Sequence, residues 1–185
     1  MKAIGFGSDG SFSWEDLSAR YHSELANGFG NLASRTVAMV NRYFDGVIQA
    51  PGEFTEADKN VSNIAATASR EADLAIAQIA PHEAIASIWK LVDELNSYIT
   101  TQEPWVLAKD PANKDRLSTV LYTAVEGLRC LAVLLAPIMP KATGRLWDSV
   151  GSSLGELADQ PISSCETWGL LQPGVKLGEL EALFP

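Results

Sequence analysis

Apolar residues recur every three or four positions through most of this chain, and such spacing predicts helices rather than strands. The clearest stripe follows Pro81 and comprises Ile85, Ile88, Trp89, Val92, Leu95 and Ile99. Residues at this spacing share one face of an α-helix and leave the opposite face polar. No pattern of parallel strands accompanies the stripes. The spacing therefore predicts an all-α fold, a bundle whose apolar helix faces pack on one another.

Proline, glycine and capping residues divide the chain into about five helices. They are expected from about Ser13 to Phe44, from Thr55 to the Ala80-Pro81 break, across Ile85–Ile99, after the Lys109–Asn113 loop, and from about Pro140 to Val150. Ser13 with Asp16, and Thr55 with Asp58, have the spacing of a capping box at a helix start. Asp45-Gly46 is a typical helix stop.

The other helices carry their own apolar stripes. In the first helix the stripe is Leu17, Tyr21, Leu25, Phe29 (or Gly28) and Leu32; in the second, Ile64, Ala68, Ala72 and Ile76; in the fourth, Leu117, Val120, Leu121, Ala124, Leu128 and Leu131. Gly28 and Gly30 interrupt the first stripe, where each lowers helix stability by about 1 kcal/mol relative to Ala. They indicate either the close approach of another helix, which we favour, or room for a ligand.

Beyond Gly155 the apolar spacing is mixed, and Pro161, Pro173 and Gly174 interrupt it. We expect a short helix and an extended tail there, held on the bundle by Trp168-Gly169-Leu170. The predicted organisation is a junction at residues 1–12, a helical bundle at 13–151 and a tail at 152–185. Residues 1–12 look like the middle of a longer protein.

Length and charge limit the classes of function. The chain has 185 residues, enough for one domain with a substantial core. Its net charge of −9 argues against general RNA coating, which relies on basic surfaces. The longest apolar run, Leu128–Met139, is too short to span a bilayer, and no signal peptide is recognisable, so we expect a cytoplasmic protein with no membrane partner. Cys130 and Cys165 are far apart in the sequence and have no neighbouring Cys or His at ligand spacing, which argues against a zinc site. The reducing cytoplasm argues against a disulfide.

Two short segments carry side chains that suit recognition of an unpaired RNA base. Asn31 and Arg35 are four residues apart and share one face of the first helix. Trp105 follows Pro104, which ends the preceding helical pattern and leaves the indole at a junction. A flat aromatic ring beside an amide and a guanidinium permits stacking and hydrogen bonding to splayed-out bases.

The same residues have ordinary interpretations. Asn31 and Arg35 are of types usually solvated on a helix face, and a Trp near a helix end usually belongs to the core. Several further polar residues are candidates for phosphate contacts, although a solvated surface position is the simpler reading of each: Asn27, Arg42, Lys109 and Lys141. The only histidines, His22 and His82, stand alone in helical contexts, and we assign them no chemistry.

Four runs distributed over the chain resemble a known family when taken in order. They are Phe6–Ser13 (FGSDGSFS), Glu24–Arg35 (ELANGFGNLASR), Leu95–Trp105 (LNSYITTQEPW) and Leu134–Lys141 (LLAPIMPK), the last followed by Leu146-Trp147. At these spacings the chain resembles the C-terminal anticodon-binding domain of bacterial methionyl-tRNA synthetase, from Phe6 to Pro185. Four motifs that occur in the same order and at the same spacings identify the family more specifically than any single motif does.

The resemblance implies recognition of the CAU anticodon of methionine tRNA by Asn31, Arg35, Pro104 and Trp105. It also implies a bundle of the class I synthetase type and, as a second partner, the catalytic domain of the same synthetase; DNA is not an expected partner. The His-Ile-Gly-His-like and Lys-Met-Ser-Lys-Ser-like motifs of that catalytic domain are absent from this sequence. We therefore expect ATP and methionine to bind the missing domain, with no cofactor and no ligase activity in this chain alone.

Three other interpretations remain. A helical protein–protein interaction or scaffold domain derived from a synthetase would keep the fold, but it would have no need of Asn31, Arg35 and Trp105. The equivalent domain of a cysteine, leucine, isoleucine or valine synthetase would not be expected to combine Asn-Leu-Ala-Ser-Arg with Glu-Pro-Trp. An autonomous enzyme on a helical bundle is disfavoured, because no Glu-x-x-His pair is present.

Overall fold

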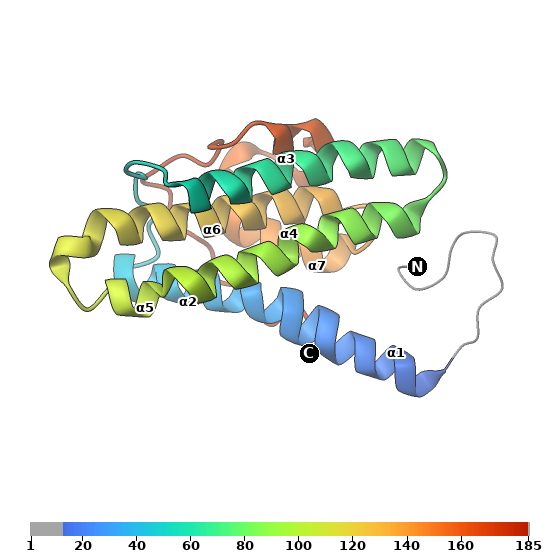
Figure 1. Cartoon of the computed structure of the whole chain (residues 1–185), viewed down its shortest axis with the longest axis horizontal. Coiled ribbons are helices and arrows are strands. Elements are labelled where there is room, and N and C mark those ends of the chain that lie inside the picture. Colours follow the sequence, from blue (N-terminus) through green and yellow to red (C-terminus); the bar gives the residue numbers. More distant parts are fainter. Residues whose placement is uncertain (1–12, 185) are drawn as a thin grey trace.

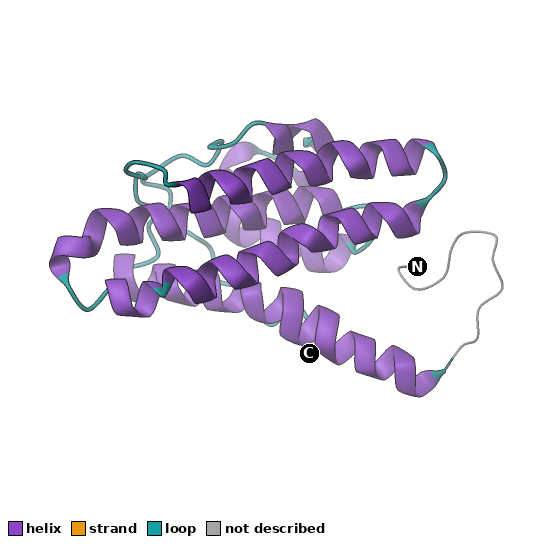
Figure 2. Ribbon diagram, in the orientation of Figure 1, coloured by secondary structure: helices purple, strands orange, loops and turns teal. Residues whose placement is uncertain are grey.

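The computed structural model describes residues 13–184, so the predicted junction at 1–12 and the Phe6–Phe12 part of the first motif lie outside the described residues. Helices joined by loops make up the described range, and no strand occurs within it (Figure 2). The one β-type contact found there is an isolated antiparallel bridge between Val47 and Lys176. The prediction of an all-α bundle is confirmed.

The first helical segment runs without a break from Trp14 to Phe44, but its winding changes along the way. Helix α1 (Trp14–Arg20) leads into a π-helical segment (Tyr21–Gly30), which leads into α2 (Asn31–Phe44). Asp45 ends the segment in the left-handed conformation, with φ of 53°. Leu17 is 47% exposed, so its predicted core position is wrong. The reason is that α1 extends away from the other helices (Figure 1) and has no partner helix to cover it.

Helices α3 (Glu56–Ala77) and α4 (Pro81–Gln102) form an antiparallel hairpin. The predicted capping box is present at the start of α3, where Asp58 accepts hydrogen bonds from the Thr55 backbone N–H at 2.7 Å and from its hydroxyl at 2.9 Å. The buried face of α3 is built largely of alanines, which allow α4 to approach closely. Ile76, expected in that face, is instead 48% exposed near the end of the hairpin.

Helix α6 (Lys114–Leu135) is the centre of the bundle, because every residue from Leu117 to Leu135 is buried. The stretch Pro111–Leu135 is long and apolar enough to cross a membrane, with a mean hydropathy of 1.4, and it exceeds the Leu128–Met139 run singled out from the sequence. Its apolar part is completely buried inside the bundle. A core helix surrounded by other helices has this composition.

Short elements complete the fold. Helix α5 (Pro104–Leu107) and a 3₁₀ turn (Pro111–Asn113) connect α4 to α6, and α7 (Pro140–Val150) follows α6. The tail contains three 3₁₀ turns, at Ser152–Leu154, Leu157–Asp159 and Ile162–Glu166, in place of the expected single short helix. Such turns have no apolar period long enough to recognise in a sequence.

A buried carboxylate fastens the tail to α6. Glu126 is fully buried and accepts hydrogen bonds from the backbone N–H groups of Gly169, Leu170 and Leu171 at 3.1–3.2 Å. Arg129, also fully buried, donates to the same carboxylate at 2.9 Å. Cys130 and Cys165 are both free and buried at this contact between α6 and the tail, where the Cys165 thiol lies 3.6 Å from the Cys130 carbonyl oxygen.

Of the two glycines in the first helical segment, Gly30 lies at a close contact, but its neighbour is the tail and not the helix expected from the sequence. A Cβ atom at Gly30 would come within 3.0 Å of the Phe184 ring, which packs against Phe29 and Tyr21. The Asn96 amide of α4 donates to the Gly28 carbonyl at 3.3 Å. Gly30 therefore lets the tail approach the helix, whereas a Cβ atom at Gly28 would meet only the Ser23 carbonyl oxygen, at 3.3 Å.

Candidate functional site

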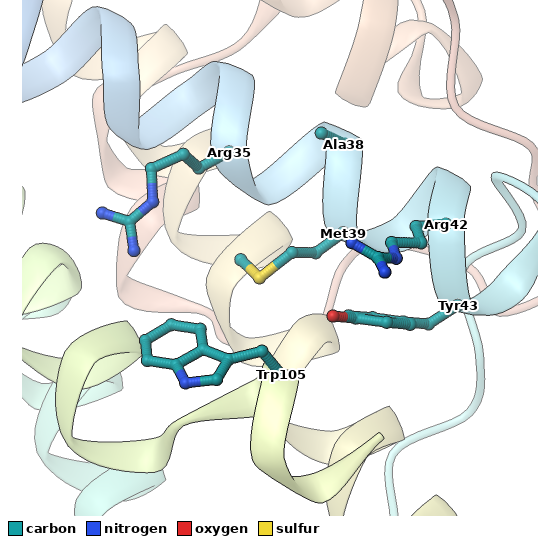
Figure 3. Close-up of a pocket in the computed structure, with 6 residues that line it drawn as sticks. All are labelled: Arg35, Ala38, Met39, Arg42, Tyr43 and Trp105. Atoms are coloured by element: carbon teal, nitrogen blue, oxygen red, sulfur yellow. The ribbon is translucent and has the colours of Figure 1, made fainter. Parts of the chain in front are cut away.

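A pocket of about 290 Å³ opens between α2 and α5, on the surface of the bundle. Its lining residues are Arg35, Ala38, Met39, Arg42, Tyr43 and Trp105 (Figure 3). All but Trp105 belong to α2, and their spacing of three, four, seven and eight residues from Arg35 places them on one helix face. The pocket therefore combines one face of a long helix with a single aromatic side chain from a short one.

The chain reversal between α4 and α5 places Trp105 at this pocket. Helix α4 ends where Glu103 adopts the left-handed conformation, with φ of 46°. Pro104 then occupies the first turn of α5, and the Glu103 carbonyl accepts hydrogen bonds from Val106 at 2.7 Å and Leu107 at 3.2 Å. Pro104 is buried while Trp105 is 37% exposed. The indole is thus held by a rigid junction and still keeps an accessible surface.

A polar network supports the end of α4 from which this junction starts. The Arg116 guanidinium of α6 donates to the Gln102 side chain at 2.6 Å and to both carboxylate oxygens of Asp58, at 2.6 Å and 3.0 Å. The Tyr98 hydroxyl donates to Asp58 as well. Burial by itself raises the pKa of Asp58, but the hydrogen bonds from Arg116, Tyr98 and Thr55 outweigh it and hold this pKa below its usual value. Asp58 is therefore a charged, fully bonded centre that joins α3, α4 and α6.

The pocket carries positive charge in an acidic chain. Arg35 is half-buried and its guanidinium points toward Trp105, whereas Arg42 is exposed and lies 5.7 Å from the centre of the Tyr43 ring (Figure 3). Neither guanidinium forms a hydrogen bond or an ion pair with any residue between 13 and 184. Met39 lies between the two aromatic side chains. The site therefore offers apolar and aromatic surface with a cation toward each end.

The structure brings together two of the four predicted residues directly. Arg35 and Trp105, seventy positions apart, line the same pocket, and Pro104 lies immediately behind Trp105. Asn31 is exposed one turn before Arg35 on α2 and does not line the pocket. No contact in the structure tests their predicted roles, which stay predictions.

Four pocket residues were not predicted as site residues: Ala38, Met39, Arg42 and Tyr43, of which Arg42 was named only as a candidate for a phosphate contact. The sequence contains a signal for them, because they continue the face of Arg35 by one and two helical turns. The position of Arg42 on the helix face of Arg35 distinguishes it from Asn27, Lys109 and Lys141, the other candidates for phosphate contacts.

The arrangement suits binding of a planar, polar group. An exposed indole permits stacking, and guanidinium groups donate hydrogen bonds in a planar fork or stack on a base. Across residues 13–184 no group of three or more His, Cys, Asp or Glu side chains is placed to hold a metal ion. The chemistry that the pocket does offer is recognition by stacking and hydrogen bonding.

Comparison with known proteins gives the site its context. Residues 58–174 match the family model described as the anticodon-binding domain of tRNA ligase. The whole chain is 48% identical to a methionine–tRNA ligase of Streptomyces coelicolor and 37% identical to that of Caldanaerobacter subterraneus, of which it covers 35% and 28%. The chain thus spans about a third of the length of these relatives.

Solved structures similar to this chain belong to the same kind of protein as its sequence relatives. The methionyl-tRNA synthetase of Mycobacterium tuberculosis in complex with methionyl-adenylate superposes with a TM-score of 0.90 at 33% identity, over 98% of this chain and 35% of that one. Its ligand-free form superposes with a TM-score of 0.88 at 34% identity. The chain therefore belongs to the family of tRNA-ligase anticodon-binding domains, as the domain of the methionyl-tRNA synthetase type.

Proposed function

We propose that this chain reads the CAU anticodon of methionine tRNA at the pocket between α2 and α5. The observation that carries the proposal is the meeting of Arg35 and Trp105, from two distant segments, at one open pocket lined by apolar and cationic side chains. Sequence-specific RNA recognition targets unpaired loop bases, which are stacked on aromatic rings and hydrogen-bonded at their edges. An anticodon loop presents bases of this kind.

Each of the four residues has a distinct role in this proposal. Trp105 stacks on the first anticodon base, and Pro104 fixes the backbone that presents the ring. Arg35 donates to acceptor atoms on a base edge beside the indole. Asn31 offers both a donor and an acceptor from the turn before Arg35, which lets it test a Watson–Crick edge.

The rest of the reaction belongs, in this proposal, to the part of the relatives that the chain does not span. ATP and methionine bind there, and this chain holds no cofactor of its own. Its partners are the anticodon loop and the catalytic domain of the same synthetase, and the cytoplasm is the place where both meet tRNA. The isolated chain is then a recognition domain that orients tRNA without activating methionine.

The decisive experiment compares two anticodon stem–loops that differ only at the first anticodon base. Binding to the 185-residue chain is followed by NMR titration at low salt, at RNA concentrations high enough to detect weak complexes. We expect the CAU stem–loop to bind more tightly, and Trp105→Ala to lose most of that preference. Trp105→Ala should also weaken binding of the CAU stem–loop itself by about 1–3 kcal/mol, the usual contribution of a base stacked on an aromatic side chain.

The matched control is Trp14→Ala. Trp14 is 72% exposed and begins α1, at the opposite end of the long helical segment from α5 (Figure 1). Its replacement removes an exposed indole without touching the pocket, so binding and preference should be unchanged. Equal binding of both stem–loops, insensitive to Trp105, would reject the proposal and favour a protein-binding scaffold.

A further inference from the structure

The seven arginines of the chain all lie in the described range, and they divide sharply by their partners. Five are engaged by carboxylates or carbonyls in ion pairs and hydrogen bonds: Arg20, Arg70, Arg116, Arg129 and Arg145. The remaining two, Arg35 and Arg42, have no such partner anywhere in residues 13–184, and both line the pocket. In a chain with 23 acidic and 14 basic side chains, two unpaired guanidiniums on one helix face indicate an anion-binding surface.

We infer that Arg42 and the Tyr43 hydroxyl form a phosphate-binding subsite, separate from the base-reading residues and resting on the proposed function. The phosphate it takes belongs to the RNA backbone, one or two nucleotides from the base that stacks on Trp105. Arg42 supplies the charge, and Tyr43 supplies a second donor and a surface that positions the guanidinium.

The geometry separates the two ends of the pocket. Arg35 and Arg42 are seven residues apart on α2, two helical turns and about 10 Å along the axis. The Arg35 guanidinium points toward Trp105, whereas Arg42 lies over the Tyr43 ring at the other end, with Met39 between them (Figure 3). The Arg35 guanidinium thus lies where it can contact the stacked base, and the Arg42 guanidinium lies where it can contact a phosphate of a neighbouring nucleotide.

The immediate surroundings leave both donors available. The Tyr43 hydroxyl points toward the interior of the pocket and makes no hydrogen bond to the described part of the protein. Asp45 is the carboxylate next along the chain, but it forms no ion pair with Arg42. A backbone phosphate has acceptor oxygens for a guanidinium and a hydroxyl at once.

Phosphate contacts and base contacts leave different signatures in binding data. A phosphate contact contributes affinity without sequence information, and its loss makes binding less dependent on salt. A base contact changes the discrimination between sequences. Arg42 should therefore affect affinity and salt dependence, while selectivity for CAU stays with Trp105 and Arg35.

The test uses the same pair of stem–loops, titrated at several salt concentrations with Arg42→Gln. We expect affinity for both RNAs to fall by the same factor, about tenfold, as for a lost hydrogen bond between charged groups. The slope of log K against log salt should become shallower by about 0.7, the value for one phosphate contact on a single strand. Tyr43→Phe should weaken both complexes less and leave the slope unchanged.

Arg70→Gln is the matched control, because it removes the same charge from α3, where Arg70 pairs with Glu166 away from the pocket. Arg42 is exposed and unpaired, so its replacement should leave the thermal unfolding midpoint unchanged. If Arg42→Gln behaves like Arg70→Gln, or if it abolishes selectivity while the salt slope stays the same, the subsite is overturned. If wild type shows no CAU preference but Arg42→Gln still lowers affinity and slope, the anticodon proposal fails while the phosphate subsite stands.

Discussion

Asp58 links the start of α3 to the segment that presents Trp105. Its carboxylate caps the helix through Thr55 and accepts from Tyr98 and Arg116, and Arg116 continues to Gln102 at the end of α4. The Asp58 carboxylate is fully buried, and so is its bond with Tyr98, whereas its bonds with Thr55 and Arg116 are partly exposed. A buried charge is tolerated only when its partners are all in place.

Replacing Asp58 should therefore cost stability in a pH-dependent way. At pH 7 we expect Asp58→Asn to lower the free energy of unfolding by about 3 kcal/mol, the lower end of the range for a broken buried ion pair, because the Arg116 side chain keeps 23% exposure. Urea unfolding at a series of pH values measures the effect. Asp93→Asn, an exposed carboxylate of α4, serves as the control and should change little.

The direction of the pH dependence follows from the lowered pKa of Asp58. In the unfolded chain this carboxyl takes up a proton near pH 4, whereas in the folded protein it stays charged to lower pH. Between the two pKa values the unfolded state binds more protons, so the stabilisation present at neutral pH is lost as pH falls. The difference in the free energy of unfolding between wild type and Asp58→Asn should shrink below about pH 4. A difference that stays constant with pH would contradict the assigned role of the Asp58 charge.

At this scale the sequence indicated part of the candidate site. Arg35 and Trp105 stood out by residue type and position. Met39 and Tyr43 did not, because an ordinary apolar residue on a helix becomes a pocket wall only where a second element faces it. That element is α5, whose four residues are too few to show a helical period.

At the scale of elements, α4 and α6 approach each other closely at Gly127 in the bundle core. A Cβ atom at Gly127 of α6 would come within 2.6 Å and 2.8 Å of the two terminal carbons of Leu95. Leu95 is fully buried, so its side chain cannot move away without displacing other core residues. This glycine is required by packing rather than by a turn.

Alanine should therefore have opposite effects at two helical glycines. Gly127→Ala adds a methyl group to a filled space, which costs about 1–3 kcal/mol and exceeds the gain in helix propensity. Gly144→Ala, in α7, meets no atom within 4 Å and should raise the free energy of unfolding by up to about 1 kcal/mol. Urea unfolding of the two variants compares them directly, and stabilisation at both sites would show that the core has unfilled room.

Elements were easier to predict than their burial. The stripe of α4 was recognised correctly because all its members pack on neighbouring helices. Leu17 and Ile76 satisfy the same period but are exposed, since α1 extends away from the bundle and Ile76 lies near the end of the hairpin. Period alone reports helix formation, whereas burial depends on which helices end up as neighbours.

At the scale of the whole molecule, the acidic charge restricts how RNA can be held in the proposed function. With a net charge of −9 and one arginine assigned to a phosphate, the pocket itself offers few phosphate contacts. In this proposal, most of the interaction at the pocket comes from stacking and base edges. The all-α fold could be predicted from the sequence because it depends only on the helical period of apolar residues. The balance between phosphate contacts and base contacts could not, because it depends on the positions of individual charges in the structure.

The salt dependence of wild-type binding checks this view. One phosphate contact on a single strand, that of Arg42, predicts a slope of log K against log salt of about −0.7. Titration of the CAU stem–loop between about 20 and 200 mM salt should give a value near this. A slope of about −4 or steeper would require additional phosphate contacts outside the pocket and would contradict the prediction.

Within residues 13–184, Arg35 and Arg42 form no ion pair or hydrogen bond through their guanidiniums, and this has a kinetic meaning. A guanidinium that is already paired must break a protein contact before it can bind a phosphate or a base, and that rearrangement slows the approach to the bound state. Arg35 and Arg42 have no ion pair of this kind to break. The backbone that carries Trp105 is likewise fixed by its junction, which lowers the cost of ordering on the protein side. In the proposed function, the domain would sample many tRNAs rapidly, with discrimination expressed in how long each one stays.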